Sequence, residues 1–492
     1  MEGTDMQLHF GVVLKVIGIV MMVIGVSMLP SFFVSLFCKD DPGVTIQFAI
    51  TVAIVFGLGL LVARKFKDSK ADLKLRDGFL LVALCWIAAS VVGAIPYFTT
   101  GVLMDPFDAF FESVSGFSTT GASVIDDVES LPKGLLFWRS FTQWIGGIGI
   151  LVFAIGLMPS LGISGQNVMS PDTPGISLGK ITTKMSDVIK TLYITYLLFT
   201  VCEIIALKLA GMSFFDALVH TFSCVGTGGF TAYNDGISHF DSAAIYMVLM
   251  VFMLICGINF NLYFLSIKHG IDRMYKDPEF RFYILTIIVV GLIICITLSV
   301  TGADDDGRPF IDSAFQTISI ISTTGFTTAD YTLWPYLCQM LLLCLMFIGG
   351  CSSSTSGGVK AIRILVVIRY IRYGIHTRLH PNSVEPISIN GQAIPSGTVS
   401  GVTYHIFLYI AMMFAGAFLL SLENIGLEDS FSSVITCMGN IGPSFGKIGA
   451  MGTFSGLHWF SKLTLSAEML AGRLELYTLF ILFTPRFWNP NN

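Results

Sequence analysis

The sequence predicts an all-α polytopic membrane protein, in which four repeats of span, half-helix, loop and span follow an N-terminal pair of transmembrane helices. Three observations support this fold class: the composition, the long apolar runs and a short polar motif that occurs four times. Of 492 residues, 53% are hydrophobic and 12% are charged. This charged share is about half that of a soluble protein, so we expect the chain to lie in a lipid bilayer.

Ten apolar runs are long enough to cross a bilayer, because a transmembrane helix needs about 20 residues. The runs cover 10–37, 44–63, 78–100, 134–160, 187–210, 243–266, 281–301, 334–371, 398–421 and 455–485. The first run lacks a basic start and is longer than the apolar core of a signal peptide, so we expect a retained helix. The net charge of -5 gives no reason to expect a nucleic-acid partner.

Basic residues cluster in alternate loops between these runs. They are found at 64–76, at 268–281 and at 369–378, whereas an intervening loop such as 303–307 is acidic. The positive-inside rule assigns the basic loops to the cytoplasm. Both termini are therefore expected to be cytoplasmic.

A polar motif recurs after four of the spans. Four stretches align without a gap: DAFFESVSGFSTTGAS from Asp108, DALVHTFSCVGTGGFT from Asp216, DSAFQTISIISTTGFT from Asp312 and DSFSSVITCMGNIGPS from Asp429. In each stretch a glycine lies 13 residues after the aspartate, at Gly121, Gly229, Gly325 and Gly442. The aspartate stands where the N-cap of a helix of about ten residues is expected. Such a half-helix is too short to cross the bilayer.

A loop with a glycine follows each half-helix at the depth of the membrane. Non-helical backbone is tolerated there only if it is buried in protein or lines a water-filled cavity, so four such loops imply one shared aqueous site. Four helix C-termini directed at that site would favour a cation, and loop carbonyls could replace its hydration shell. One such loop alone would indicate an ordinary turn; four in register favour the shared site.

The four loop sequences resemble those of the Trk/Ktr/HKT superfamily of potassium transporters, and most closely its TrkH-type members. We call them the filter loops: TTGA (119–122), TGGF (227–230), TTGF (323–326) and NIGP (440–443). The resemblance implies a potassium-channel-like fold of four M1–pore-helix–M2 repeats with pseudo-fourfold symmetry, preceded by two extra helices. The expected parts are the N-terminal pair at 1–70 and repeats at 71–165, 180–270, 278–380 and 395–492, with pore loops at 107–123, 215–231, 311–328 and 428–445.

By this resemblance the filter loops together bind potassium ions, the transported substrate, and no covalent cofactor is expected. The residues expected to bind potassium are Thr119, Thr120, Gly121, Thr227, Gly228, Gly229, Thr323, Thr324, Gly325, Asn440, Ile441 and Gly442. A serine at the first filter glycine is associated with sodium-permeable members, so glycine in all four loops points to potassium. The fourth loop departs from the pattern, because Asn440 and Ile441 replace a Thr-rich pair.

A second unusual stretch, FIGGCSSSTSGGVKAIR at 347–363, interrupts the eighth span. Glycine and serine weaken a helix, so we expect a break two to three turns below the filter. The resemblance implies that 349–358, the gate loop, blocks the pore and moves during gating, and that Arg473 projects toward it. The expected gate is Gly349, Gly350, Cys351, Ser352, Ser353, Ser354, Thr355, Ser356, Gly357, Gly358 and Arg473.

Each of these interpretations has a structural alternative. The gate loop could be a small-residue packing face between helices, and Arg473 could form an ion pair with Glu468 or Glu475. Further buried polar residues carry weaker hypotheses, and they are Glu112, Arg139, His220, Asn259 and Asn261. The ten cysteines include no CxxC pair, which argues against a disulfide framework or a zinc site.

The resemblance implies potassium uptake across the bacterial inner membrane by a homodimer with one pore per chain, regulated by a separate cytosolic nucleotide-binding subunit of the TrkA type. Proton- or sodium-coupled symport is the alternative, and the residues do not separate the two, although no buried carboxylate pair is evident. An integral-membrane enzyme is a third hypothesis. Against it, the sequence lacks HExxH, a clustered His/Asp metal set and a Ser-His-Asp arrangement.

Overall fold

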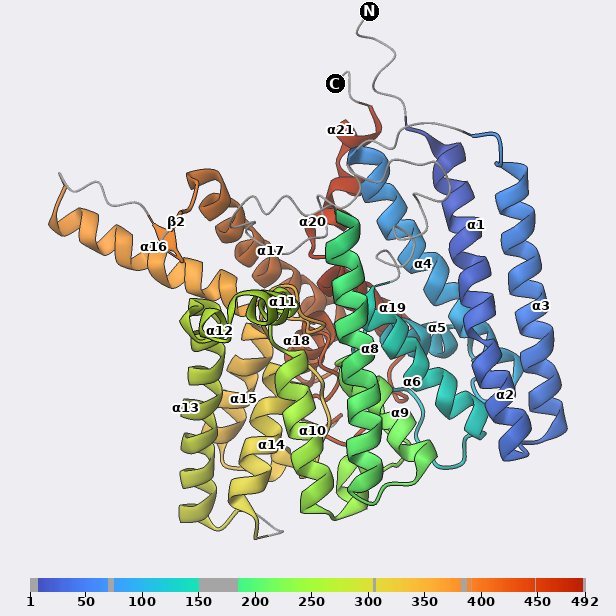
Figure 1. The fold of residues 1–492 in the computed structure, drawn as a ribbon, viewed down its shortest axis with the longest axis horizontal. Coiled ribbons are helices and arrows are strands. Elements are labelled where there is room, and N and C mark those ends of the chain that lie inside the picture. The colour runs from blue at the N-terminus through green and yellow to red at the C-terminus, as the bar shows by residue number, and fades with distance from the viewer. Residues whose placement is uncertain are drawn as a thin grey trace, which may run out of the picture.

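Helices form nearly all of the regular structure in the computed structural model (Figure 1), which confirms the predicted fold class. The structure describes residues 8–69, 75–149, 185–303, 307–381, 387–390, 392–446 and 448–489. Within these residues the one sheet is a hairpin of two short antiparallel strands, β1 (Ser388–Ile389) and β2 (Gln392–Ala393).

The N-terminal part forms one side of the molecule. It consists of α1 (Phe10–Ser27), α2 (Leu29–Cys38) and α3 (Pro42–Lys65). The expected span 10–37 is therefore divided at Met28, just before Leu29 and Pro30 begin α2, because proline suits the first turn of a helix. Helix α1 packs along α3 and also against the first helix of the first repeat.

Each repeat begins with a long, unbroken helix that packs against the half-helix following it. The first helices are α4 (Leu75–Thr99), α8 (Met185–Leu209), α13 (Pro278–Thr301) and α17 (Ser396–Ser421). The half-helices are α5 (Pro106–Phe117), α9 (Phe214–Val225), α14 (Pro309–Ile321) and α18 (Leu427–Gly439). All four half-helices thus lie where the repeat of the sequence predicts them.

The aspartates of the repeat are not the N-caps, which corrects the sequence prediction. The N-cap residues are Asp105, Ser213, Arg308 and Gly426, and the repeated aspartates lie in the first turn of each helix. A carboxylate is stabilised in that turn by the positive end of the helix dipole. At α9 the two positions cooperate, because the backbone N–H of Asp216 donates to Ser213 Oγ and that hydroxyl donates to the Asp216 carboxylate.

The second helices of the repeats are short, and within the described residues three of them end in a break. They are α6 (Lys133–Ile148), α10 (Ala243–Cys256), α15 (Tyr336–Ile348) and α19 (Trp459–Arg473). Beyond their breaks follow α11 (Phe260–His269), α16 (Ala361–Leu379) and α20 (Tyr477–Phe480). The expected spans 243–266 and 455–485 contain breaks that the sequence did not predict, and 334–371 is broken as predicted. The part of 134–160 beyond Gly149 lies outside the described residues.

The half-helices and second helices alternate around a closed ring. Each second helix packs against its own half-helix and against the half-helix of the next repeat, in the order α5, α6, α9, α10, α14, α15, α18, α19 and back to α5. The long first helices form an outer layer around this ring. The four repeats therefore surround one centre, as the shared-site argument requires.

The outer layer has the surface of a membrane protein. By length and composition, 6 helices could each cross a membrane, or 7 if the pair α10 and α11, bent by 85°, counts as one span. In α13 only 11% of the apolar window is buried, whereas in α4 the share is 61%. The difference arises because the N-terminal helices cover α4, and so they replace lipid at the first repeat.

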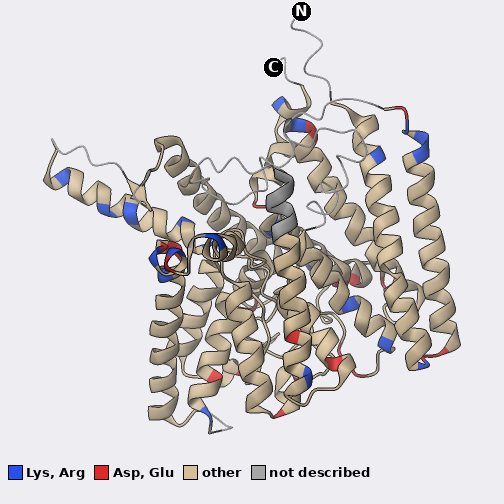
Figure 2. Cartoon of the chain, in the orientation of Figure 1, with Lys and Arg blue, Asp and Glu red and all other residues tan. Residues whose placement is uncertain are grey.

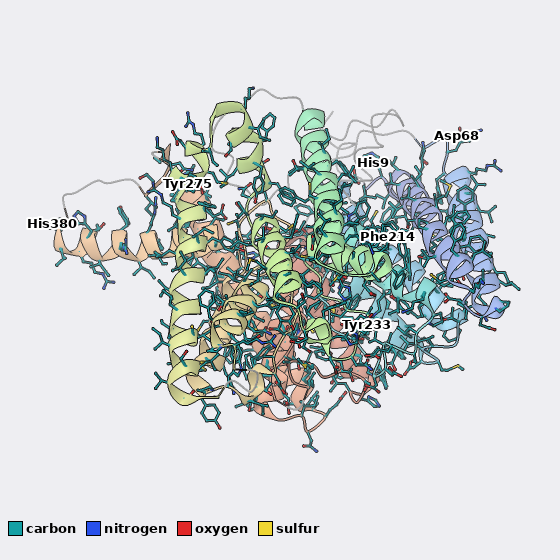
Figure 3. The ribbon with its side chains drawn as sticks, turned by 60° about the horizontal axis from the view of Figure 1, so that its bottom comes forward. His9, Asp68, Phe214, Tyr233, Tyr275 and His380 are labelled. Carbon is teal, nitrogen blue, oxygen red and sulfur yellow. The ribbon has the colours of Figure 1, made fainter. Side chains whose placement is uncertain are left out.

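Charge is distributed unevenly between the two ends of the bundle. Lysines and arginines gather on α16, around α12 (Asp272–Lys276) and at the ends of α3 and α4 near α21 (Pro485–Trp488) (Figure 2). The positive-inside rule predicts that this end is cytoplasmic, and that orientation stays a prediction. Helix α16 projects from the bundle, with His380 near its far end (Figure 3). Three 3-10 turns complete the described elements: η3 (Gly236–Phe240), η4 (Tyr331–Leu333) and η5 (Ile481–Phe483).

Candidate functional site

All four half-helices end in the same backbone geometry. The first filter residue is left-handed in every loop, with φ of 56° at Thr119, 53° at Thr227, 57° at Thr323 and 53° at Asn440. Its N–H donates to the carbonyl three residues earlier at 2.9–3.1 Å, and the next N–H donates to the carbonyl five residues earlier at 2.8–3.0 Å. These two bonds are a Schellman motif, which satisfies the last carbonyls of a helix.

This geometry explains the unusual residues of the fourth loop. A β-branched residue seldom adopts a left-handed conformation, whereas asparagine tolerates it. Asn440 therefore meets the same backbone requirement as the three threonines at lower strain. Its side-chain amide also donates to Thr120 Oγ1 and to the Met469 carbonyl, both at 3.0 Å, and so ties the fourth loop to the first loop and to α19.

The four filter glycines close the loops into a ring. Each has a positive φ, and a Cβ atom there would collide with a carbonyl oxygen of the next loop. Gly121 faces the oxygen of Gly228, Gly229 that of Thr324, Gly325 that of Ile441, and Gly442 that of Thr120. The contacts run once around the four loops in chain order. No side chain fits between them, so glycine is required by both conformation and space.

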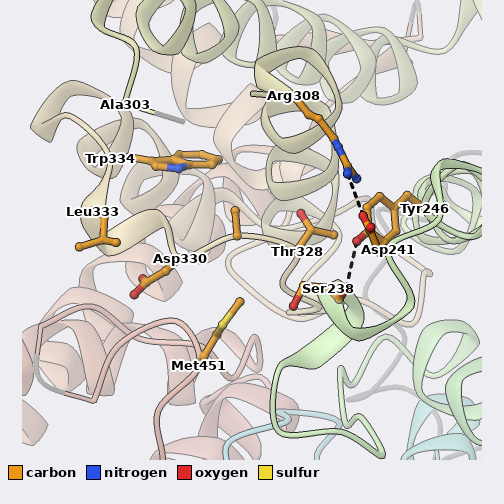
Figure 4. Close-up of a pocket in the computed structure, with 11 residues that line it drawn as sticks. Ser238, Asp241, Tyr246, Ala303, Arg308, Thr328, Asp330, Leu333, Trp334 and Met451 are labelled. Carbon is orange, nitrogen blue, oxygen red and sulfur yellow. Dashed lines mark hydrogen bonds and ion pairs between the residues drawn. The ribbon is translucent and has the colours of Figure 1, made fainter. Parts of the chain in front are cut away.

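The same glycines line one small pocket of about 130 Å³. Gly121, Gly229, Gly325 and Gly442 all contribute to its wall, together with Arg139 and residues of the loops beyond the filter. A larger cavity of about 390 Å³ lies to one side, between the loops that follow α9 and α14 (Figure 4). Its wall contains the ion pair of Arg308 with Asp241 (2.8 Å) and none of the filter glycines. The smaller pocket is therefore the mouth of the ring.

The ring offers oxygen atoms to a cation. Within the described chain, the carbonyls of Thr120, Thr324 and Ile441 accept no hydrogen bond. The Gly228 carbonyl differs, because it accepts one from the side chain of Gln143 at 2.7 Å, and Gln143 in turn accepts one from the N–H of Phe230. Four helix C-termini lie directly at the ring, and their partial negative charge stabilises a cation there.

A buried ion pair supports the first loop from behind. Glu112 of α5 is fully buried, accepts hydrogen bonds from the hydroxyl of Ser123 and the N–H of Val124, and pairs with Arg139 of α6 at 2.6 Å. Arg139 also donates to the carbonyl of Thr231 in the segment after the second filter loop. The pair thus links the first two loops through hydrogen-bonded charged groups.

Polar side chains also connect the segments that follow the first and second filter loops. Asn234, after the second filter loop, donates its side-chain amide to Asp127, after the first, at 3.0 Å. This hydrogen bond lowers the pKa of the exposed Asp127 carboxyl.

Two other candidate residues bond within their own helices. The Nδ1 of His220 lies 2.8 Å from the carbonyl of Asp216 in the same helix. Asn259 caps α11 by accepting from the N–H of Asn261.

The gate loop fills the break between α15 and α16, and its contacts cross to other repeats. The N–H of Cys351 donates to the Gly257 carbonyl at 2.9 Å, and the N–H of Phe260 donates to the Ser353 carbonyl at 3.1 Å. The break of the second repeat and the break of the third repeat therefore satisfy each other's backbone groups. A packing face of small residues would be helical, so that alternative is wrong.

The gate loop lies closer to the filter than the sequence suggests. The N–H of Gly357 donates to Thr323 Oγ1 at 2.7 Å, and a Cβ atom at Gly357 would collide with the Gly439 carbonyl. The loop therefore contacts the base of the filter directly, instead of lying two to three turns below it. The reason is that 12 residues, 349–360, separate the two helices, and a non-helical chain of this length reaches back toward the ring.

Arg473, the last residue of α19, also binds the gate loop. Its guanidinium donates to the Thr355 carbonyl at 2.8 Å and to the carbonyls of Gly146 and Gly147 at 2.8 and 3.2 Å. One side chain thus joins the ends of α19 and α6 to the gate loop. The alternative, an ion pair of Arg473 with Glu468 or Glu475, is wrong for the described residues: Arg473 bonds backbone carbonyls, and Glu475 pairs with Arg363 of α16.

A profile of the TrkH family, described as a cation transport protein, matches residues 44–489. The chain belongs to the TrkH family. The Trk system potassium uptake protein TrkH of Escherichia coli is 35% identical over 98% of this chain and 100% of that protein. The corresponding TrkH of Halomonas elongata is 33% identical over 97% of this chain and 98% of its own length. The crystal structure of the potassium transporter TrkH from Vibrio parahaemolyticus has a TM-score of 0.87 at 34% identity, covering 98% of this chain and 100% of that chain.

Membership of the TrkH family confirms two predictions made from the sequence. The chain is a membrane transport protein, and the hypothesis of an integral-membrane enzyme is set aside. The match also extends over the N-terminal helices, because the relatives are covered almost end to end. The roles of individual residues at the filter and the gate remain predictions.

Sequence reasoning missed three side chains at this site. Gln143 holds the second filter loop, Glu279 of α13 binds Ser352 of the gate loop, and Lys360 donates to the Ser356 carbonyl. A signal for the breaks themselves was present in the sequence. Gly149 and Gly257 each lie 28 residues after a filter glycine, Gly121 and Gly229, and both stand at the end of a second helix.

Proposed function

We propose that this chain takes up potassium ions across the bacterial inner membrane through the ring of its four filter loops. The observation that carries the proposal is the closed ring of contacts, in which each filter glycine meets a carbonyl of the next loop. The relatives described above are a potassium transporter and potassium uptake proteins. Potassium is the substrate in this proposal, and no covalent cofactor takes part.

In the proposed mechanism an ion exchanges part of its hydration shell for oxygen atoms of the ring. Backbone carbonyls and threonine hydroxyls of the twelve filter residues, from Thr119 to Gly442, supply these oxygens. The dipoles of α5, α9, α14 and α18 stabilise the charge of the ion where its hydration is weakest. The Glu112–Arg139 pair and Gln143 hold the first two loops at the distance that the ion requires.

The gate loop and Arg473 form the gate in this proposal. Support comes from the position of Gly357 at the base of the filter and from the bonds of Arg473 to three backbone carbonyls around it. A loop held there closes the path below the ring. Breaking its bonds to Arg473 frees the loop to move aside, and ions then pass.

A cytosolic nucleotide-binding subunit of the TrkA type is the proposed regulator, and a homodimer with cytoplasmic termini is the proposed assembly. Helix α16 is the proposed contact, because it projects from the bundle with exposed basic residues (Figures 1 and 2). Arg369 is partly engaged by the Ser388 carbonyl, so Arg372→Glu with Arg378→Glu tests the contact better. Unchanged co-purification of the regulator with this variant would remove α16 from the interface.

The test of the filter is potassium selectivity. In cells that lack potassium uptake, the chain is expected to restore growth at low potassium, and Gly325→Ser is expected to lower the preference for potassium over sodium by about tenfold or more. Asp330→Asn, outside the filter, is the control. Equal selectivity of the Gly325 variant and the wild type would contradict the filter.

Coupling to a second ion is tested separately. The reversal potential of the current through the purified protein is measured in liposomes while the proton and sodium gradients are changed one at a time. A channel mechanism predicts that the reversal potential follows the potassium gradient alone. A shift with either of the other gradients would replace it by symport.

A further inference from the structure

A buried carboxylate of α13 binds the gate loop at Ser352, three residues before the contact of Arg473 with Thr355. Glu279 is the second residue of α13, and only 3% of its surface is exposed. The backbone N–H of Ser352 donates to Glu279 Oε1 at 2.5 Å, and the hydroxyl of Ser352 donates to Oε2 at 2.8 Å. Both oxygens of one carboxylate therefore bind a single residue of the gate loop.

Three other bonds at this end of the gate loop join neutral groups. They join Cys351 to Gly257, Ser353 to Phe260, and Ser352 to Asn259. A hydrogen bond to an ionised group is roughly twice as strong as one between neutral groups. Glu279 thus holds Ser352 through both oxygens of one carboxylate, and Arg473 binds the loop three residues later, at Thr355.

We propose that Glu279 is a positioning residue that latches the gate loop beneath the filter and thereby sets how often the pore opens. The proposal rests on the gating role proposed above for 349–358. It concerns the balance between closed and open states, because Glu279 contacts the loop and none of the filter residues. Loss of the latch therefore raises conduction and leaves ion selectivity unchanged.

The start of α13, next to Glu279, is also bound to the β1–β2 hairpin. Asp277 is the N-cap of α13 and accepts the N–H of Phe280 on Oδ1, while its Oδ2 accepts the side-chain amide of Asn390 at 3.0 Å. Asn390 is exposed at the turn of the β1–β2 hairpin, which follows α16. A displacement of this hairpin is transmitted to the start of α13, two residues from Glu279.

The experiment compares two carboxylates that accept backbone N–H groups. Glu279→Ala removes the latch, whereas Glu423→Gln alters a carboxylate that accepts the N–H groups of His458 and Ser461 at the start of α19. Single-pore recordings of the purified full chain should show an open probability on the order of tenfold higher for Glu279→Ala. The potassium to sodium permeability ratio should match the wild type, and Glu423→Gln should behave as the wild type. An unchanged or lower open probability in folded Glu279→Ala protein would overturn the latch.

Two further measurements separate the latch from the gate itself. In a chain lacking 349–358, the Glu279→Ala change should have no additional effect on conduction. A further rise in conduction would contradict the role of Glu279 and leave the gating role of 349–358 unaffected. If that chain conducts no more than the wild type, the gating role fails and the latch with it. Hydrogen exchange provides a readout that is independent of conduction: the Ser352 amide should exchange faster in Glu279→Ala and at the wild-type rate in Glu423→Gln. Equal exchange in both variants would exclude the latch.

Discussion

The first and second helices of the repeats contrast in length and in the partners of their polar groups. The first helices have 24–26 residues without interruption, whereas the second helices have 13–16 residues before a break. About 20 residues are needed to cross the hydrocarbon core. The outer helices can therefore anchor the protein in lipid, and the inner helices cannot cross it alone.

The inner helices are short, and this explains why their ends hydrogen-bond to one another. A helix that ends within the membrane leaves carbonyl and N–H groups that lipid cannot satisfy. Here the breaks satisfy one another: the second and third exchange backbone bonds, and Arg473 at the fourth binds the third and the first. We therefore expect a displacement at one break to change the bonds at the others.

The largest expected effect contrasts an inner glycine with an outer one. Gly325→Ala places a methyl group against the Ile441 carbonyl at a φ of 79°, and the left-handed conformation alone costs about 1–2 kcal/mol for other residues. We expect potassium uptake to fall on the order of tenfold or more, and the residual uptake to lose its preference for potassium as in Gly325→Ser, because both variants carry the same Cβ atom. Gly291→Ala, on α13, meets nothing closer than 3.7 Å and should leave uptake unchanged. Normal uptake by the Gly325 variant would show that the ring tolerates a side chain.

The sequence predicted the regions in which local signals are strong. The half-helices and filter loops follow from an aspartate and a glycine 13 residues apart, and the outer helices follow from uninterrupted apolar runs. The N-cap assignment failed because the same aspartate also suits the first turn. The breaks at Gly257 and after Arg473 were missed because apolar residues continue on both sides, and hydropathy does not respond to a bend.

The contacts of the gate could not be read from the sequence. Ser352 and Glu279 are 73 positions apart, and Arg473 and Gly146 are 327 positions apart. Only the closed ring of four repeats brings these residues together, and no local pattern encodes the pairing. The sequence thus indicates which residues are polar in the membrane, and the fold decides which of them are partners.

A second prediction contrasts a buried ion pair of the inner ring with an exposed pair of the outer loops. Glu112→Gln leaves Arg139 without its charged partner in a buried site, which costs about 3–5 kcal/mol. Thermal unfolding in detergent should detect this loss, and sodium permeability should rise because the first two filter loops lose their connection. Asp241→Asn removes the partner of Arg308, but the two side chains are 73% and 37% exposed. Its effect should be within about 1 kcal/mol.

Equal destabilisation by the two substitutions would contradict this contrast. A loss of stability without a change in selectivity would restrict the Glu112–Arg139 pair to folding. A loss of selectivity in Asp241→Asn would instead assign the outer loops a direct role in ion recognition. The contrast is supported only if Glu112→Gln strongly lowers both stability and selectivity and Asp241→Asn changes each of them little.

The smallest expected effect tests whether an inner break is coupled to the gate loop. The Asn259 side chain caps α11 and donates to Ser352 Oγ at 3.3 Å, whereas the exposed Ser299 of α13 donates to the Cys295 carbonyl of its own helix. Loss of a capping side chain costs about 1 kcal/mol, so Asn259→Ala should speed hydrogen exchange in 351–353 by about fivefold. Ser299→Ala should leave that exchange unchanged, because the hydroxyl of Ser299 bonds within α13. If Asn259→Ala changed hydrogen exchange in α11 alone, the Asn259 side chain would not couple the second break to the gate loop. The coupling between breaks would then depend on the backbone bonds and on Arg473.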